Sequence, residues 1–520
     1  MIAWPDRGGV ARGGGAVAAE QPRAMGNRTL ILVATLLATF LTAMESTVVS
    51  TAMPTVIGEL RGLDLYAWVF SVYLLTSTAT VPLYGRLADM IGRKPVFVVG
   101  IGIFLVGSAL SGAAQSMPQL ILFRAIQGLG AGAVQPIVFT IMGDLFTLEQ
   151  RARVQGLFSA VWGTSSLAGP AVGALITETI GWRWIFYINL PFGVAATILL
   201  AWALRERRVE RRHRLDYAGA ATLTAGITVV LWGLLSNGRG GSVNLPALGL
   251  GLAILVGFVA IELRVPEPIL PLDLFRQPFI AVPCLAGLVT GMVQFGLPSY
   301  VPLFVQGVQL GSAGDAAKAL GSVSVAWTVA AFVSPRLLIR FGFRRVAIVG
   351  MLLIVVGTAC LLLYRRETPV ALMMLNLFCT GFGLGLSSNA CLLAAQSAVG
   401  WERRGVVTAS VQFSRTIGGT LGVAALGATL NAQLAPTLRA VGGADVSALL
   451  SPATRGNLGA EAIQLVQAAL TTGLREVYLI IVIVAVCGVA FACFIPAQRA
   501  QAQAAAVGVA RAEAVGETAP

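Results

Sequence analysis

The sequence predicts an all-α membrane protein, a bundle of spanning helices arranged as two related halves. Composition, the length of the apolar runs and an internal repeat all point to this class. Of the 520 residues 56% are hydrophobic and only 11% are charged, whereas a soluble domain carries about 25% charged residues. The mean hydropathy is +0.81. So few charges over this length exclude a soluble protein with a large core.

The apolar runs are long enough to cross a membrane. A spanning helix needs roughly 20 predominantly apolar residues. Fourteen stretches of the sequence approach or exceed this length. The predicted spans are 29–53, 65–84, 95–114, 118–141, 153–178, 184–204, 216–235, 245–263, 279–307, 317–339, 346–363, 369–395, 405–430 and 476–496.

The basic residues predict how the bundle is oriented. The chain has 36 Lys and Arg against 23 Asp and Glu, a net charge of +13. Most of these cations fall in alternate loops, and basic loops stay in the cytoplasm. We therefore expect both termini to be cytoplasmic, in the inner (plasma) membrane. No basic cluster is interleaved with exposed aromatics, so binding to nucleic acid is not expected.

An internal repeat divides the chain. Several glycines and one charged pair of the first half recur in the second half at one constant offset. This predicts two six-helix halves, 29–204 and 265–496, with a basic loop and an inserted helix pair at 205–264. Such repeats place a substrate site near the midplane between the halves. The recurring residues are Gly128, Gly130, Gly132, Glu149, Arg151 and Gly169, which recur as Gly381, Gly383, Gly385, Glu402, Arg404 and Gly422.

The remaining segments carry no sign of catalysis. Residues 1–28 are rich in Gly, Ala and Arg and are expected to form a disordered cytoplasmic N-terminus. Residues 431–475 are expected to be a polar outer loop, and 497–520 a cytoplasmic tail. The six cysteines lie in apolar stretches without metal-ligand spacing, and His213 stands in a run of arginines. We therefore expect no metal, no cofactor and no enzyme activity.

The loop after the second span is a recognisable motif, Gly85–Lys94. Its glycines allow a tight turn, and Asp89 at the membrane edge can pair with cations or helix N-termini. The motif resembles the signature loop of the major facilitator superfamily. The resemblance implies the major facilitator fold, with Gly85, Asp89, Gly92 and Arg93 as a conformational switch. A degenerate copy after the tenth span has Ile339 in place of Asp89, so only the first copy can carry the charge.

The fourth span contains an arginine, Arg124, in the run Leu122–Gly132. A charged residue inside the membrane is costly and marks a functional site by default. The run is similar to the family's arginine motif, which is linked to proton transfer. Alternatively, Arg124 is a structural arginine whose donors are satisfied by backbone carbonyls.

Glu45 is the only carboxylate well inside a predicted span. With ~1.5 Å of rise per residue, Glu45 and Arg124 are predicted at similar depth. Glu45 is therefore the expected proton carrier, at a position where the family usually has aspartate. Alternatively, the two residues form a permanent structural pair.

The fifth span ends in Ala168–Ala174, where Gly169, Pro170 and Gly173 combine a proline kink with small residues. This run resembles the antiporter motif found in exporters of the superfamily. Generic packing of small residues is the alternative.

Three further runs, Trp182–Pro191, Pro268–Leu272 and Phe413–Gly419, are similar to fourteen-helix drug:proton antiporters of the EmrB/QacA type. An aromatic belt at the membrane interface is a sufficient physical account of the first run.

The resemblance implies a proton-coupled antiporter that exports small lipophilic or cationic drugs. The expected partners are the lipid bilayer, protons and a small amphipathic substrate, and also a periplasmic adaptor if the cell has an outer membrane. The alternatives are export of an endogenous metabolite such as a siderophore, peptide or self-made antibiotic, a nutrient:proton symporter, and a membrane sensor that transports nothing. The candidate cavity residues are Trp162, Gln294, Tyr300, Trp327, Asn389 and Arg415.

Overall fold

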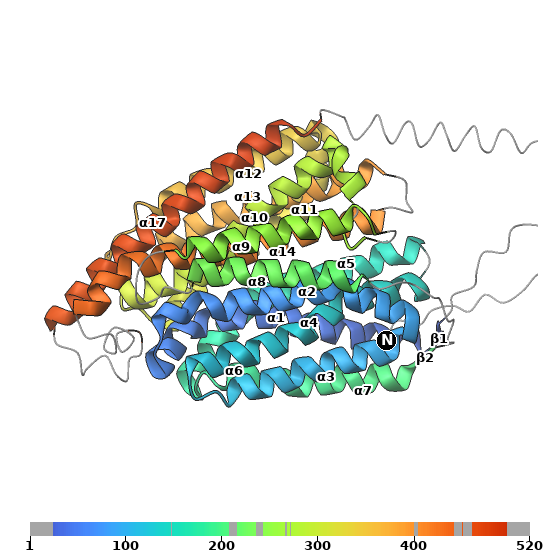
Figure 1. Cartoon of the computed structure of the whole chain (residues 1–520), viewed down its shortest axis with the longest axis horizontal. Coiled ribbons are helices and arrows are strands. Elements are labelled where there is room, and N and C mark those ends of the chain that lie inside the picture. Colours follow the sequence, from blue (N-terminus) through green and yellow to red (C-terminus); the bar gives the residue numbers. More distant parts are fainter. Residues whose placement is uncertain are drawn as a thin grey trace, which may run out of the picture.

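The computed structural model describes residues 24–146, 148–206, 216–235, 243–265, 268–270, 272–399, 404–440, 450 and 460–496. Within these residues the chain is almost wholly helical, and its long helices run side by side (Figure 1). Two short strands, β1 (Ala24–Gly26) and β2 (Leu204–Glu206), pair antiparallel. The predicted all-α membrane fold is confirmed.

The described helices are α1 (Arg28–Leu60), α2 (Tyr66–Ile91), α3 (Arg93–Gly112), α4 (Met117–Leu145), α5 (Leu148–Thr179), α6 (Trp184–Tyr187), α7 (Asn189–Ala203), α8 (Tyr217–Leu235), α9 (Leu245–Glu262), α10 (Pro278–Leu303), α11 (Ala313–Phe341), α12 (Phe343–Leu361), α13 (Val370–Ser397), α14 (Arg404–Ala440) and α17 (Ala460–Cys493). Single helical turns lie at Leu63–Leu65, Leu272–Arg276 and Phe304–Val308.

The repeated glycines make the same helix contacts in both halves. A Cβ on Gly130 of α4 would lie 2.5 Å from the carbonyl oxygen of Gly100 on α3. A Cβ on Gly383 of α13 would lie equally close, 2.5 Å, to the carbonyl oxygen of Gly350 on α12. Only glycine allows backbones to approach this closely. The repeat read from the sequence is therefore also a repeat of packing.

The inserted pair, α8 and α9, lies across the seam between the halves. Figure 1 shows the two helices, in green, between the blue first half and the yellow-to-red second half. α8 packs against α2 of the first half and α14 of the second, while α9 packs mainly against α8.

The two halves share a core at one end of the bundle. We call the end where α1 finishes the Glu59 end, and the end where α2 meets α3 the Gly92 end. Toward the Glu59 end, a single apolar cluster contains buried residues of both halves, among them Val56 and Leu303. At the Gly92 end, the buried residues of the first half, such as Phe97, form a cluster of their own. The first-half members of the shared core therefore lie on the Glu59 side, whereas its second-half members extend as far as Leu338 and Phe343 at the turn between α11 and α12.

Twelve described helices are long and apolar enough to cross a membrane, by length and composition. The fourteen predicted spans are thus reproduced only in part, because α5 and α14 are not among the twelve. Both helices carry polar residues in mid-helix, for example Ser165 in α5 and Arg415 in α14. α5 packs between α1 and α11, and α14 between α10 and α2. Helices covered by protein need less apolar surface than helices that face lipid.

Two segment boundaries differ from the sequence prediction. α14 continues to Ala440 and α17 begins at Ala460, so helix occupies both ends of the expected outer loop 431–475. At the N-terminus, Ala24–Gly26 form a strand inside the segment 1–28 that was expected to be disordered. Hydropathy detects only the apolar part of a helix, and a three-residue strand has no periodicity to detect.

Candidate functional site

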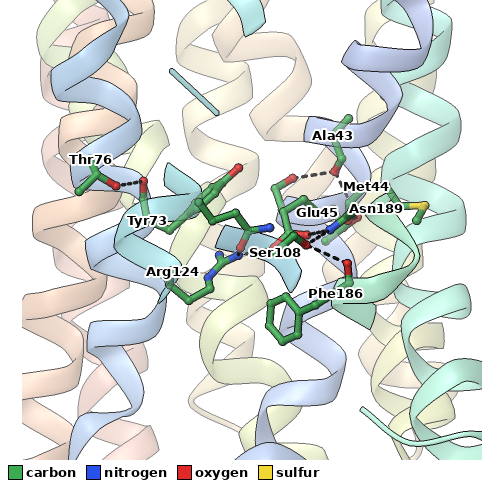
Figure 2. A network of polar contacts seen from close by, with 12 residues as sticks. Ala43, Met44, Glu45, Tyr73, Thr76, Ser108, Arg124, Phe186 and Asn189 are labelled. Carbon is green, nitrogen blue, oxygen red and sulfur yellow. Dashed lines mark hydrogen bonds and ion pairs between the residues drawn. The ribbon is translucent and has the colours of Figure 1, made fainter. Parts of the chain in front are cut away.

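The structure brings Glu45 and Arg124 into direct contact inside the first half. Nη1 of Arg124 donates to Oε1 of Glu45 (Figure 2). Glu45 is 1% exposed and Arg124 2% exposed. The pair is therefore enclosed by protein in this conformation.

Glycines build the site by letting three helices approach one another. Gly107 of α3 lies so close to α4 that its Cβ would meet the Gln127 backbone, with 2.5 Å to the Cα atom. Gly128 of α4 faces α2 in the same way, and its Cβ would lie 2.6 Å from the carbonyl oxygen of Tyr73. The Tyr73 ring then stacks on Arg124, with 4.1 Å between the guanidinium carbon and the ring centroid. A cation held over an aromatic face gains electrostatic attraction.

The second carboxylate oxygen of Glu45 has its own donor. Nδ2 of Asn189, the first residue of α7, donates to Glu45 Oε2 and also to Ser108 Oγ, at 3.0 Å. The Ser108 hydroxyl in turn donates to the carbonyl oxygen of Phe186, at 2.8 Å. Figure 2 shows these side chains converging from α1, α3, α4 and α7.

The hydrogen bonding of this network is incomplete. Arg124 Nη1 also donates to Gln127 Oε1, at 2.7 Å. Arg124 Nε, Gln127 Nε2 and Asn189 Oδ1 are buried without a partner among the described residues. Burying an ion pair costs desolvation energy that only full hydrogen bonding repays. The pair therefore repays only part of its desolvation energy, and it is weak evidence for stabilisation of the fold.

The switch motif lies far from this pair, at the Gly92 end. Gly92 has φ of 102°, which favours glycine, and it links α2 to α3. Glu206 accepts from the backbone N–H groups of Arg93 and Lys94, at 2.8 and 3.1 Å. The side chain of Asp89 lies outside the described residues, and Gly85 has open space beside it.

Glu206 was not singled out in the sequence, because it stands in a basic loop that the charge rule alone explains. An acid at the N-terminus of α3 complements the helix dipole. It therefore ties the end of the first half to the motif loop.

The small residues of the antiporter motif face α1. A Cβ on Gly173 would lie 2.5 Å from Thr51 Oγ1, and one on Gly169 would overlap Thr47. Pro170 lies within α5, and its carbonyl oxygen accepts from Thr51 Oγ1 at 3.5 Å. The motif therefore packs against α1 next to the turn that carries Glu45.

The candidate cavity residues have diverse surroundings. Tyr300 is fully buried, and its hydroxyl donates to the carbonyl oxygen of Val423 at 2.8 Å. It therefore belongs to packed protein in this conformation. Asn389 donates to Ser334 Oγ at 3.0 Å. Trp162 is 38% exposed, and Gln294 Oε1 has no partner among the described residues. Trp327 and Arg415 are partly buried.

Four residues of the network were not predicted from the sequence: Tyr73, Ser108, Gln127 and Asn189. Gln127 and Asn189 lie in runs that were matched to family motifs, but no role was assigned to these two side chains. Tyr73 and Ser108 lie in apolar runs outside any motif. Asn189 fell in a run interpreted as an interfacial aromatic belt. The available signal was physical, because a buried amide requires hydrogen-bond partners and therefore points to a polar site.

No group of three or more His, Cys, Asp or Glu residues suitable for a metal occurs in the part of the chain that the structure describes.

Comparison with known proteins gives consistent matches. Residues 35–423 match the family model described as Major Facilitator Superfamily. The chain is 37% identical to the multidrug transporter protein MdtP of Bacillus subtilis, over 78% of this chain and 76% of that protein. It is 29% identical to an acurin A biosynthesis cluster MFS-type transporter of Aspergillus aculeatus, over 90% of this chain and 88% of that protein.

Among solved structures, a bacterial homolog of the human lysosomal transporter Spinster, in an inward-facing and unoccupied conformation, aligns with a TM-score of 0.66. The alignment covers 90% of this chain and 96% of that structure at 16% identity. At this identity the match concerns the fold alone.

Proposed function

Because the chain belongs to the Major Facilitator Superfamily, we propose that it is a proton-coupled antiporter that exports small lipophilic or cationic drugs across the plasma membrane. It is a multi-pass membrane protein, and its relatives include multidrug efflux transporters. The observation that carries the proposal is the enclosed pair of Glu45 and Arg124.

The pair suits a proton carrier because Glu45 has partners that favour its charged form. Arg124 and Asn189 each donate to one carboxylate oxygen. A movement that takes Arg124 away would leave a buried carboxylate, which then takes up a proton to become neutral. Alternating access would thus couple the position of Arg124 to proton binding. A cationic substrate that reached the carboxylate would displace the proton directly.

The proposal includes fourteen spans, as in the EmrB/QacA type, with the Gly92 end in the cytoplasm. α5 and α14 are as long as the twelve apolar helices and pack among them. The core shared near the Glu59 end supports a conformation closed on the outer side.

Substitution of the carboxyl tests the proton role. Glu45→Gln should abolish dye efflux driven by a pH gradient in inverted vesicles, because an amide cannot carry the proton. Glu45→Asp should keep part of the activity, since the acid remains but is shorter. Expression of each variant is checked by immunoblot. Full pH-driven efflux by Glu45→Gln would refute the proposed proton site.

A second candidate is export of an endogenous metabolite. It is favoured by the similarity to a transporter named for a biosynthesis cluster. A gene deletion separates drug export from metabolite export. Both drug susceptibility and the compounds secreted into the medium are measured in the deletion strain. Increased susceptibility supports drugs, whereas a secretion defect without it supports a metabolite.

A further inference from the structure

Asn189 occupies a special place beside Glu45. It is the first residue of α7, directly after the short helix α6 and one linking residue. This start of a new helix places the amide inside the bundle, where it is fully buried. It touches the proposed proton site, and its burial leaves no surface for a substrate.

Ser108 determines which way the amide faces. The Ser108 hydroxyl donates its hydrogen to the carbonyl oxygen of Phe186, at 2.8 Å. Toward Asn189, the Ser108 oxygen can therefore act only as an acceptor. The amide nitrogen must then face both Ser108 and Glu45, as hydrogen-bond networks fix amide orientation. The amide oxygen is left buried and without a partner among the described residues.

We propose that Asn189 is a positioning residue that serves Glu45 in both of its protonation states, with Ser108 setting its orientation. The inference rests on the proposed function, in which Glu45 carries the proton. While Glu45 is charged, the amide N–H groups donate to Oε2 of Glu45 and to Ser108 Oγ. When Oε2 takes a proton from the transport path, it becomes a donor and needs an acceptor.

The amide supplies this acceptor by turning over. A half-turn of the amide presents Oδ1 to the new O–H of Glu45. The Ser108 hydroxyl then rotates from the Phe186 carbonyl to Oδ1. The Phe186 carbonyl keeps the backbone N–H of Ile188 as a partner. Asparagine is suited to this task because its amide carries donors and an acceptor in one planar group.

The test measures the protonation of Glu45 directly. A hydrophobic carbodiimide reacts with protonated carboxyls, and the modified Glu45 peptide is quantified by mass spectrometry across a pH series on the full-length protein in nanodiscs. Asn189→Leu preserves the approximate volume but removes the donor. The pH of half-maximal labelling should rise by about one unit, because the hydrogen bond lost from charged Glu45 is stronger than the one lost from neutral Glu45. Ser108→Ala should shift it in the same direction by less.

A matched control lies on the same helix as Ser108. Ser111 is fully buried, and its hydroxyl has no partner among the described residues. Ser111→Ala should leave the labelling profile unchanged.

The outcomes separate this inference from the proposed function. If Glu45→Gln is inactive but neither Asn189→Leu nor Ser108→Ala moves the labelling profile, the role of Asn189 is overturned and the proton site stands. If Asn189→Leu does not fold, Ser108→Ala decides the matter. If Glu45→Gln remains active, the proposed function fails, while a shifted labelling profile would still support the contact between Asn189 and Glu45.

Discussion

Gly169 illustrates how one residue controls the distance between two helices. A side chain there would overlap Thr47, two residues along α1 from Glu45, with Thr47 Cβ only 2.8 Å from the added Cβ. Such overlap forces either a rotamer change or a helix shift, and overpacking typically costs 1–3 kcal/mol. The small residue therefore holds α5 against α1 beside Glu45.

We expect Gly169→Ala to lower the thermal stability of the purified protein and to slow efflux. Alanine improves helix propensity by about 1 kcal/mol, so the net loss should be up to about 2 kcal/mol. Tryptophan fluorescence during heating measures the stability. Gly102→Ala is the control, because nothing lies within 4 Å of its Cβ. It should be neutral or slightly stabilising, and equal destabilisation by both variants would contradict the packing argument.

The carboxylate of Glu45, on α1, forms hydrogen bonds to side chains of two other helices. Its two oxygens are held by different elements, Oε1 by α4 and Oε2 by α7. A shift of either helix relative to α1 therefore changes the partners of the acid. Under the proposed function, this would link the protonation of Glu45 to the arrangement of the helices in the first half.

At the scale of elements, α5 and α11 meet across the two halves. The Glu178 carboxylate at the end of α5 accepts from the backbone N–H of Gly314 in the first turn of α11, at 2.9 Å. Nearby Ala174, Ala313 and Ala317 form a small apolar cluster between the same helices. A carboxylate at a helix N-terminus is favourable through both the hydrogen bond and the helix dipole. The contact joins the two halves at the Glu59 end, and we expect it to break if that end opens.

Glu178→Ala should therefore shift the population toward the state that is open at the Glu59 end. A cysteine at Ala317, in a cysteine-free background, should react about threefold to fivefold faster with a membrane-impermeant maleimide, since an exposed charged contact is worth about 1 kcal/mol or less. Glu461→Ala provides the control, as this exposed acid lies in the first turn of α17. Unchanged reactivity in Glu178→Ala would show that the contact does not hold the halves together.

At the scale of the whole molecule, the apolar core is unevenly shared. The two halves have a common cluster toward the Glu59 end, and at the Gly92 end the first half keeps a separate cluster. Burial of apolar surface is the main favourable term in association. The halves are therefore held together where the core is common, and the other end is the one where they can separate. The inserted pair adds a further link, because α8 contacts both α2 and α14.

The orientation of the molecule can be tested by labelling from outside intact cells. Arg366, in the turn after α12, and Arg264, after α9, are both exposed and lie at opposite ends of the bundle. A cysteine at Arg366 should react with an impermeant maleimide in intact cells, and one at Arg264 only after permeabilisation. The reverse pattern would invert the proposed topology. Ser451, in the expected outer loop, is less suitable because it lies outside the described residues.

Much of this arrangement could be predicted from the sequence, because hydropathy and glycine spacing are patterns within single chain segments that show where the helices lie. The inserted helices were predicted at 216–235 and 245–263, and the structure has them at Tyr217–Leu235 and Leu245–Glu262. The similar depth of Glu45 and Arg124 followed from helix rise, whereas their direct contact is seen only in the structure. The end of α14 and the start of α17 could not be predicted from hydropathy. A helix continues beyond its apolar part when the following residues have sufficient helix propensity.

By itself, the sequence determined that the chain is a helical membrane protein with two repeated halves and a rare buried pair of opposite charges. Each of these features depends on residue type and spacing along one chain segment or on a constant offset between two. Only the tertiary structure decided that Asn189 and Ser108 complete the site, that Glu206 ties α3 to the connection after α7, and that the halves share a core near one end. These contacts join residues far apart in sequence, for example Asn189 and Glu45. Their formation depends on how glycine-lined helices pack in three dimensions, which no local pattern records.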